Sequence, residues 1–353
     1  MNSDPTDPAA PPPPAVPPAA PPTSADVARL AGVSRATVSF VLNNTPGGRV
    51  GEQTRARVLA AADRLGYVPH AGARSLRAGR TGLILMAGST VPIGPLFSGF
   101  YREFQDALLP RGYTGVLLGT TLGSGDDAAR AWAELRPTAV VCLTPGLTAE
   151  GVRILLRSGT RAVFTLGPEP VPGAHALIMD QVEVGLCAAT HLLERGRRRI
   201  GVVVPADPAL APFSGARLAG VRAAVAAAGG GPSDGGAVEP LSLEYTEESA
   251  AALVARCREL SLDGLFGYND EYAMLALRAL QDAGLDVPGE IALVGADDLL
   301  LGRLLRPRLT SVRMRLPGGG HLADLVDRAL TDPGSALVSQ DLMTVELVAR
   351  DSS

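Results

Sequence analysis

Residues 23–43 read TSADVARLAGVSRATVSFVLN, and this stretch decides the fold of the first part of the chain. Thr23 or Ser24 is a favoured helix cap, and apolar residues follow at positions 27, 30 and 31, which is helical spacing. Gly32 is typical of a helix end, and Ser34 can cap a second helix over residues 35–43. Two short helices joined by a tight turn that contains glycine form the helix-turn-helix pattern.

A third amphipathic helix is predicted from about residue 52 to residue 65, after the turn-forming segment 44–48. Its apolar face would pack against the first two helices. In a helix-turn-helix, the second helix enters the major groove of DNA with its N-terminal side chains on base edges. The spacing alone leaves a second interpretation open, an ordinary three-helix bundle that binds no nucleic acid.

Charge is distributed unevenly along the chain. Nine Arg and three acidic residues lie between positions 23 and 80, although the net charge of the whole chain is −4. A basic block ahead of an acidic body favours a polyanionic partner at one end, or else a solvated basic surface. Residues 1–22 contain ten Pro and have neither a basic start nor a Leu-rich core. We therefore expect a disordered leader there, and not a signal peptide.

The segments ADVARLAGVSRATVSFVLN and TRARVLAAADRLGYVP resemble the headpiece of the lactose-repressor/galactose-repressor (LacI/GalR) family of transcription regulators. The resemblance implies a helix-turn-helix DNA-binding domain over residues 23–69. In such a domain, Arg can chelate a guanine edge and an Ala methyl can meet a thymine methyl. The resemblance implies base contacts from Arg35 and Ala36, and phosphate contacts from Thr37, Ser39 and Asn43.

Two residues of the headpiece depart from the family pattern. Phe40 stands where many members have Arg. At this DNA-facing position, apolar contact or shape readout must replace the usual guanine contact, or that base pair goes unread. Gly51 stands where the family usually has Ser, and Gly is a somewhat poorer helix cap than Ser.

Residues 70–80 resemble the hinge helix of the family, which folds when two subunits lie side by side on the operator. The resemblance implies that Leu76 wedges into the minor groove and kinks the duplex, while Arg74 and Arg77 contact phosphates. His70 replaces the usual Asn, and Gly72 costs about 1 kcal/mol of helix propensity relative to Ala. We expect a helix that is marginal without DNA, and a flexible linker is the alternative.

Short apolar runs alternate with helical patterns from residue 81 onward. Fully apolar strands separated by helices predict an α/β domain with parallel sheets that are covered on both faces. The domain is too long for one lobe, so we expect two. The resemblance to the LacI/GalR family implies their bounds, the first at about 81–178 and 311–333 and the second at about 179–310 and 334–353. The predicted strands are 82–86, 114–118, 139–143, 162–166, 200–204, 264–267 and 291–295.

The resemblance to the LacI/GalR family continues through this domain, and in all it covers residues 24–353. It is carried by MDQVEVGLCAATHLLERGRRRIGVV, GLFGYNDEYAMLALRALQDAGLDVPGEIALVGADD, RPRLTSVRM and VELVARDSS. The resemblance implies a periplasmic-binding-protein-like fold that binds its effector between two lobes. Arg217 matches the effector-clamping Arg of the family, and Phe97 lies near an aromatic that stacks on a ring. Amide and carboxylate groups that bind hydroxyls are matched by Asn269, Asp270, Asp297 and Asp298.

Each of these residues also has a structural interpretation. Asn269-Asp270 opens a helix and can serve as its cap, and Asp297-Asp298 can cap or form ion pairs at a loop. Phe97 can belong to the core. Gly94 and Gln181 replace Asn of the family, so a degenerate or non-sugar pocket is an open alternative.

The sequence therefore predicts a homodimeric transcriptional repressor. Two headpieces would read the half-sites of a pseudo-palindromic double-stranded DNA operator. A small effector, a sugar or related polyol, would act from the interlobe cleft. Two other classes compete: a solute-binding transport protein, which needs a signal peptide, and a ligand-independent DNA binder with a degenerate pocket.

Enzymatic, metal-binding and membrane functions find little support in the sequence. It contains no GxxxxGK[ST], HExxH or GxSxG motif, and its four His are scattered. The three Cys are widely spaced, which is typical of free buried thiols. No apolar run approaches the length of a membrane span. We expect a cytoplasmic protein that is not an enzyme and uses no cofactor or metal.

Overall fold

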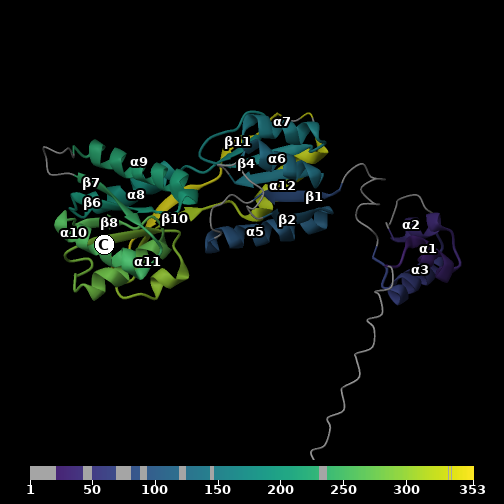
Figure 1. Ribbon diagram of the computed structural model, residues 1–353, viewed down its shortest axis with the longest axis horizontal. Coiled ribbons are helices and arrows are strands. Elements are labelled where there is room, and N and C mark those ends of the chain that lie inside the picture. Colours follow the sequence, from purple (N-terminus) through teal and green to yellow (C-terminus); the bar gives the residue numbers. More distant parts are fainter. Residues whose placement is uncertain are drawn as a thin grey trace, which may run out of the picture. The chain divides into compact units, whose positions relative to one another are not determined.

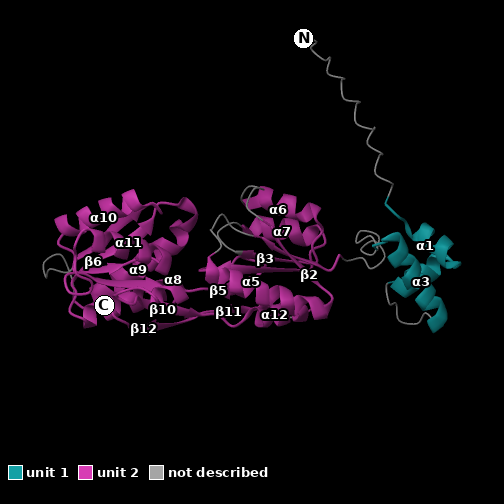
Figure 2. Cartoon of the chain, turned by 90° about the horizontal axis from the view of Figure 1, so that it is seen from below, with its two compact units in different colours: residues 1–79 teal, residues 80–353 magenta. Residues whose placement is uncertain are grey.

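The computed structural model describes residues 21–42, 50–68, 81–87, 94–118, 125–143, 147–229, 237–332, 334 and 336–353. The chain divides into two compact units, residues 1–79 and residues 80–353 (Figure 2). Several predictions fall outside the described residues. These are the leader up to residue 20, Asn43, and the hinge helix with Arg74, Leu76 and Arg77.

The first unit contains the three predicted helices, α1 (Ser24–Ala31), α2 (Arg35–Leu42) and α3 (Glu52–Leu65). Thr23 caps α1, because its hydroxyl accepts a hydrogen bond from the Asp26 N–H while the Asp26 carboxylate accepts one from the Thr23 N–H. Gly32 ends α1 with a φ of 66°, a left-handed conformation that glycine adopts without strain. Gly51 begins α3 without a side-chain cap, as the sequence predicts.

Valine and alanine side chains make the core of the headpiece. Val27, Val38 and Val58 are buried among small residues of the three helices. Leu30, which the apolar spacing assigned to the inner face of its helix, is instead exposed, and so is Leu59 of α3. The helices meet through Ala28, Ala31, Ala61 and Ala62, so the close contact leaves the two leucines at its edge.

The second unit is built on two six-stranded sheets, and we call the part built on each sheet a lobe. In the sheet of the first lobe, with the order β11-β5-β4-β3-β1-β2, every neighbouring pair of strands is parallel. Figure 1 labels four of these strands, β1, β2, β4 and β11. Its strands are β1 (Leu83–Ala87), β2 (Thr114–Leu118), β3 (Ala139–Leu143), β4 (Ala162–Gly167), β5 (His175–Ile178) and β11 (Ser339–Asp341).

The sheet of the second lobe has the order β12-β10-β9-β8-β6-β7. It is parallel except for the antiparallel pair of β10 and β12. Its strands are β6 (Arg199–Pro205), β7 (Ala237–Leu243), β8 (Gly264–Phe266), β9 (Ala292–Ala296), β10 (Thr310–Arg315) and β12 (Thr344–Val348).

Helices cover both faces of each sheet, which confirms the predicted α/β architecture. In the first lobe, one apolar cluster lies under α5 and α12 and a second under α6 and α7. In the second lobe, α8 and α9 cover one face and α10 and α11 the other. The bounds are α5 (Pro95–Leu108), α6 (Gly125–Glu134), α7 (Ala149–Arg157), α8 (Gln181–Glu194), α9 (Ala211–Ala227), α10 (Glu247–Glu259), α11 (Asp270–Asp282) and α12 (Gly319–Thr331).

The lobe boundaries predicted from the sequence need correction. Residues 310–315 form β10 of the second lobe, whereas we assigned 311–333 to the first; residues 339–341 form β11 of the first lobe, whereas we assigned 334–353 to the second. The chain passes between the lobes at three places, after β5, after β10 and after β11. Strand pairing fixes these crossings, and pairing over such distances leaves no mark on the local sequence.

Candidate functional site

The predicted DNA-reading surface is the exposed side of α2. The hydroxyl of Ser34 accepts a hydrogen bond from the Thr37 N–H at 3.1 Å and so caps the helix. Arg35, Ala36 and Phe40 are exposed, while Val38 on the same helix is buried. Thr37 and Ser39 are half-buried at the edge of this surface. The arrangement leaves the first turn of α2 open to a partner, and the individual base and phosphate contacts stay predictions.

The second unit holds a cavity of about 930 Å³. Four parallel strands of the second lobe, β6 to β9, contribute to it through the loops that follow their carboxyl ends, which is where α/β sheets bind ligands. Residues 94–98 of the first lobe line the other side. Further lining residues are Met179, Gln181, Ala206, Asp207, Leu210, Phe213, Arg217, Glu244, Tyr245, Tyr268, Asn269, Glu271, Tyr272, Asp297, Met314, Leu316 and Met343.

Arg217 is the only cation among the described residues that line the cavity, and it is buried. Its Nε donates to Oε1 of Gln181 at 2.9 Å, and its Nη1 donates to the carbonyl oxygen of Tyr268 at 2.6 Å. The guanidinium also lies over the ring of Tyr268, with Cζ 4.6 Å from the ring centroid. These contacts fix the guanidinium in place, so a ligand meets a preorganised donor.

Two glycines allow the close contact of α8 and α9 that places Arg217. A Cβ at Gly185 of α8 would lie 1.8 Å from the carbonyl oxygen of Arg217. A Cβ at Gly220 of α9 would lie 2.0 Å from the carbonyl oxygen of Val182. The backbones therefore approach to a distance that only glycine permits, and this brings Gln181 at the start of α8 within reach of Arg217.

Arg217 is linked to all three chain crossings between the lobes. Gln181 directly follows the first crossing, and Met314 on β10 precedes the second; the Arg217 Nη2 lies 3.6 Å from the sulfur of Met314. Met343 belongs to the third crossing, and its sulfur lies 3.9 Å from Nε2 of Gln181. Arg217 therefore contacts, directly or through Gln181, a side chain at each segment that joins the lobes.

Three tyrosines form an aromatic group in the cavity that the sequence analysis missed. Tyr245 and Tyr272 meet edge to face with ring centroids 5.1 Å apart, and Tyr268 and Tyr272 do so at 5.7 Å. Tyr245 follows β7 and Tyr268 follows β8, so their position just past strand ends was the available signal. For Tyr245 that signal was hidden, because Pro240 and Glu239 obscured strand β7.

Four carboxylates line the cavity: Asp207, Glu244, Glu271 and Asp297. Of these, only Asp297 was predicted from the sequence. Burial raises the pKa of Asp297 to about 6; the positive charge of Arg217 opposes this shift and the negative charge of Glu271 adds to it. Asp297 has a φ of 101°, an unusual conformation that turns the chain at the end of β9.

Asn269 and Phe97, also predicted from the sequence, both line the cavity. Asn269 is at the same time the N-cap of α11, because its Oδ1 accepts a hydrogen bond from the Tyr272 N–H at 3.0 Å. Phe97 is half-buried on α5 and packs near Phe100, with ring centroids 6.4 Å apart. Both interpretations of each residue, structural and ligand-binding, are thus compatible with its position.

Asp270 does not lie at the cavity, and our assignment of it as a ligand-binding residue is corrected. Its carboxylate is buried and accepts hydrogen bonds from the Ser311 hydroxyl at 2.7 Å and the Leu299 N–H at 2.6 Å. Burial raises the pKa of Asp270 to about 7, although both hydrogen bonds favour the charged form. This side chain ties α11 to β10 and to the loop after β9.

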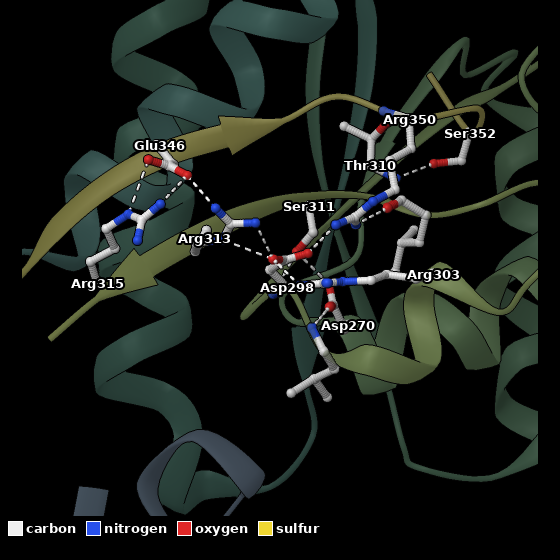
Figure 3. A network of polar contacts seen from close by, with 12 residues as sticks. Asp270, Asp298, Arg303, Thr310, Ser311, Arg313, Arg315, Glu346, Arg350 and Ser352 are labelled. Atoms are coloured by element: carbon white, nitrogen blue, oxygen red, sulfur yellow. Dashed lines mark hydrogen bonds and ion pairs between the residues drawn. The ribbon is translucent and has the colours of Figure 1, made fainter. Parts of the chain in front are cut away.

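Asp298 is likewise absent from the cavity lining, because three arginines surround it (Figure 3). Arg303 and Arg313 form ion pairs with Oδ2 at 2.9 and 2.6 Å, and Arg350 forms one with Oδ1. Burial alone would raise the pKa of Asp298, but hydrogen bonds and charges from Arg350 and Arg313 outweigh it and lower the pKa. The network joins the loop after β9 to β10 and to the segment after β12.

Comparison with known proteins assigns both units to one family. Residues 23–70 match the bacterial regulatory proteins of the lacI family, and residues 189–353 match the periplasmic binding protein-like domain. The chain is 32% identical over 319 residues to the ribose operon repressor of Escherichia coli strain K12, covering 88% of this chain and 94% of that protein. It is 30% identical to the transcriptional repressor PurR of Photobacterium profundum, covering 94% of this chain and 98% of that protein.

A solved structure of the complex of the transcriptional regulator CelR with cellobiose superposes with a TM-score of 0.62. It is 27% identical and covers 94% of this chain and 100% of that chain. Each of these matches spans most of this chain and nearly all of the relative. The chain therefore belongs to the LacI family and is a DNA-binding transcriptional regulator.

Proposed function

We propose that this regulator is a homodimeric repressor whose operator affinity is controlled by a sugar or related polyol bound in the cavity. The observation that carries the proposal is the cavity of about 930 Å³ at the strand ends, with a fixed guanidinium, carboxylates and an amide converging on it. These groups pair with hydroxyls, and the volume lies in the usual range for small-molecule sites. Two similar proteins support a sugar as the effector, since one is named the ribose operon repressor and the other is a complex of CelR with cellobiose.

Control by an effector is favoured over ligand-independent DNA binding. A degenerate pocket would have no use for a buried guanidinium that is linked to three crossings between the lobes. A ligand that prefers one arrangement of the lobes shifts the population toward it, and differential affinity is all that this requires. The cavity and the crossings together supply such a mechanism.

The proposal is tested by selecting genomic fragments with the purified protein. The enriched site is then titrated in the absence and presence of a panel of sugars and polyols. We expect a near-palindromic site whose affinity for the protein changes with one of the panel compounds. A site whose affinity is indifferent to every compound would support the ligand-independent alternative.

Replacing Arg35 with alanine is expected to lower affinity for the selected site by about ten- to a hundredfold, since a bidentate base contact is worth about 1–3 kcal/mol. Arg35 is exposed, so the melting temperature should not change. Fluorescence anisotropy with the selected site and with single-base variants measures the effect. Arg57→Ala, an exposed arginine on α3, is the control and should lose only a small, sequence-independent part of the affinity.

The homodimer has a candidate contact surface on the second lobe. Leu300, Leu301 and Leu304, in and beside the short helix η4 (Leu300–Arg303), are 68%, 59% and 66% exposed. Apolar residues that are exposed together on a surface are a mark of interaction sites. We propose that the same surface of a second subunit covers them, as the symmetry of a dimer requires.

Leu301→Glu is expected to shift the protein from dimer to monomer and to lower operator affinity by more than about tenfold, because each monomer then holds a single half-site. Light scattering after size-exclusion chromatography gives the mass, and anisotropy gives the affinity. Leu156→Glu, an exposed leucine on α7 of the first lobe, is the matched control. An unchanged dimer in Leu301→Glu would show that the contact surface lies elsewhere.

We place the regulator in the cytoplasm, where its DNA partner lies, and propose no catalytic role for its cavity carboxylates. The relatives named above are regulators of transcription. Within the described ranges, no helix is both long and apolar enough to cross a bilayer, and no cluster of three potential metal ligands occurs.

A further inference from the structure

The cavity has an excess of negative charge. Asp207, Glu244, Glu271 and Asp297 line it together with one cation, Arg217. None of the four carboxylates takes part in an ion pair with any described residue. Arg217 forms hydrogen bonds with Gln181 and the Tyr268 carbonyl, and its single positive charge offsets at most one of the four carboxylates. An anionic ligand would be repelled here.

Two tyrosine hydroxyls at the cavity are without a partner. Tyr268 is 5% and Tyr272 is 9% exposed, and neither hydroxyl forms a hydrogen bond with the described part of the chain. Neither is enclosed away from solvent, since the fully buried unpaired atoms of the described residues belong to Thr160 and Arg197. Both residues line the cavity, so their hydroxyls are available to a ligand or to water.

The tyrosines and the carboxylates lie together. The pKa of Tyr272 is raised by burial first, and then by the negative charges of Asp207, Tyr268, Tyr245 and Glu271. Burial also raises the pKa of Tyr245, with a further contribution from Glu271. The Glu271 carboxylate extends to the first lobe, because its Oε2 lies 3.9 Å from where a Cβ of Gly94 would be. Aromatic faces with carboxylates around them form the surroundings that bind organic cations.

We propose, building on the effector cavity assigned above, that the effector carries a protonated amine held by Glu271, Asp207 and the rings of Tyr245 and Tyr272. A neutral sugar would pair its hydroxyls here but would leave the partly buried carboxylate of Glu271 without a countercharge. An amino sugar satisfies both parts of the cavity. Its ammonium group meets the acidic aromatic side, and its hydroxyls meet Arg217, Asn269 and Asp297.

The inference is tested on the full chain with glucosamine, galactosamine and mannosamine as probes. Each is compared with its parent neutral hexose and with its N-acetyl derivative, in which the positive charge is removed. We expect at least one amine to raise the melting temperature and to bind at least about tenfold more tightly than its two uncharged counterparts. Calorimetric titration at two salt concentrations should show weaker binding of the amine at high salt.

Substitutions distinguish the contribution of the negative charge to amine affinity from the contributions of the other cavity contacts. Glu271→Gln should lower amine affinity by about tenfold and leave the affinity for the neutral hexose unchanged. Tyr272→Leu should lower amine affinity because the aromatic face is lost, whereas Tyr272→Phe should retain most of it. Glu248→Gln, at an exposed glutamate of α10 outside the cavity, is the matched control.

The experiments distinguish failure of the amine assignment from failure of the effector cavity. A neutral hexose that binds as tightly as its amine overturns the charge assignment and leaves the effector cavity in place. Absence of binding by all three amines also overturns it. If, in addition, no sugar or amine changes the affinity for the selected operator, control by an effector of this class fails as well.

Discussion

Replacing Gly185 with alanine is expected to destabilise the protein by at least about 3 kcal/mol and to weaken effector binding by more than about tenfold. The new Cβ would lie 1.8 Å from the carbonyl oxygen of Arg217, which is backbone and cannot rotate away. Helices α8 and α9 must therefore separate, and the bond between Gln181 and Arg217 is lost with them. Denaturant unfolding measures the stability, and calorimetric titration measures the binding.

Gly215→Ala is the matched control for this change. Gly215 lies on α9 near Arg217, but a Cβ there has no atom within 4 Å. Alanine favours helix over glycine by up to about 1 kcal/mol, so this variant should be as stable as the parent or slightly more stable. Equal stability of Gly185→Ala and Gly215→Ala would mean that the two helices are not held in close contact.

Replacing Asp298 with alanine is expected to cost about 3–5 kcal/mol, because removal of this member of a buried ion network leaves the charge of Arg350 without its ion-pair partner. The carboxylate is 2% exposed and binds Arg303, Arg313 and Arg350, of which Arg350 is itself largely buried. Effector affinity of the folded fraction should not change, because Asp298 is not part of the cavity. Thermal and denaturant unfolding, with calorimetric titration below the melting temperature, measure both quantities.

The stabilising effect of Asp298 should depend on pH. Its pKa is lowered in the folded protein, so the stabilisation is complete above the unfolded pKa of about 3.9. This stabilisation is lost as the pH falls through the pKa that Asp298 has in the folded protein. The difference in stability between the parent and Asp298→Asn should therefore shrink in acid. Asp282→Ala, which removes an exposed pair with Arg278, should cost less than about 1 kcal/mol at any pH.

Local patterns in the sequence were sufficient for the elements that depend on local physics. The cap at Thr23, the helix end at Gly32 and the apolar strands β2 and β3 are where the sequence predicted them. Strands β5, β7, β10, β11 and β12 were missed, since they are short, polar or interrupted by Pro240. Their pairing is decided by distant neighbours, which no local period reveals.

The ligand site was predicted in part, for a related reason. Arg217, Asn269, Asp297 and Phe97 line the cavity, whereas Asp270 and Asp298 do not. Adjacent residues at a strand end point in different directions, so Asp297 faces the cavity while Asp298 faces Arg313. The two aspartates are adjacent in the sequence, and the sequence alone does not determine the direction in which each side chain points. The three tyrosines were missed because they are far apart in the sequence and share no motif.

The three crossings between the lobes also bear on how the chain folds during synthesis. Strand β11 and helix α12 complete the first lobe, yet they are translated after nearly all of the second. Neither lobe can close its sheet until the last part of the sequence has left the ribosome. Contacts this distant in sequence slow folding and leave strand edges exposed meanwhile. An edge and one face of the first lobe thus stay uncovered while the second lobe is translated, and we expect this topology to favour dependence on chaperones.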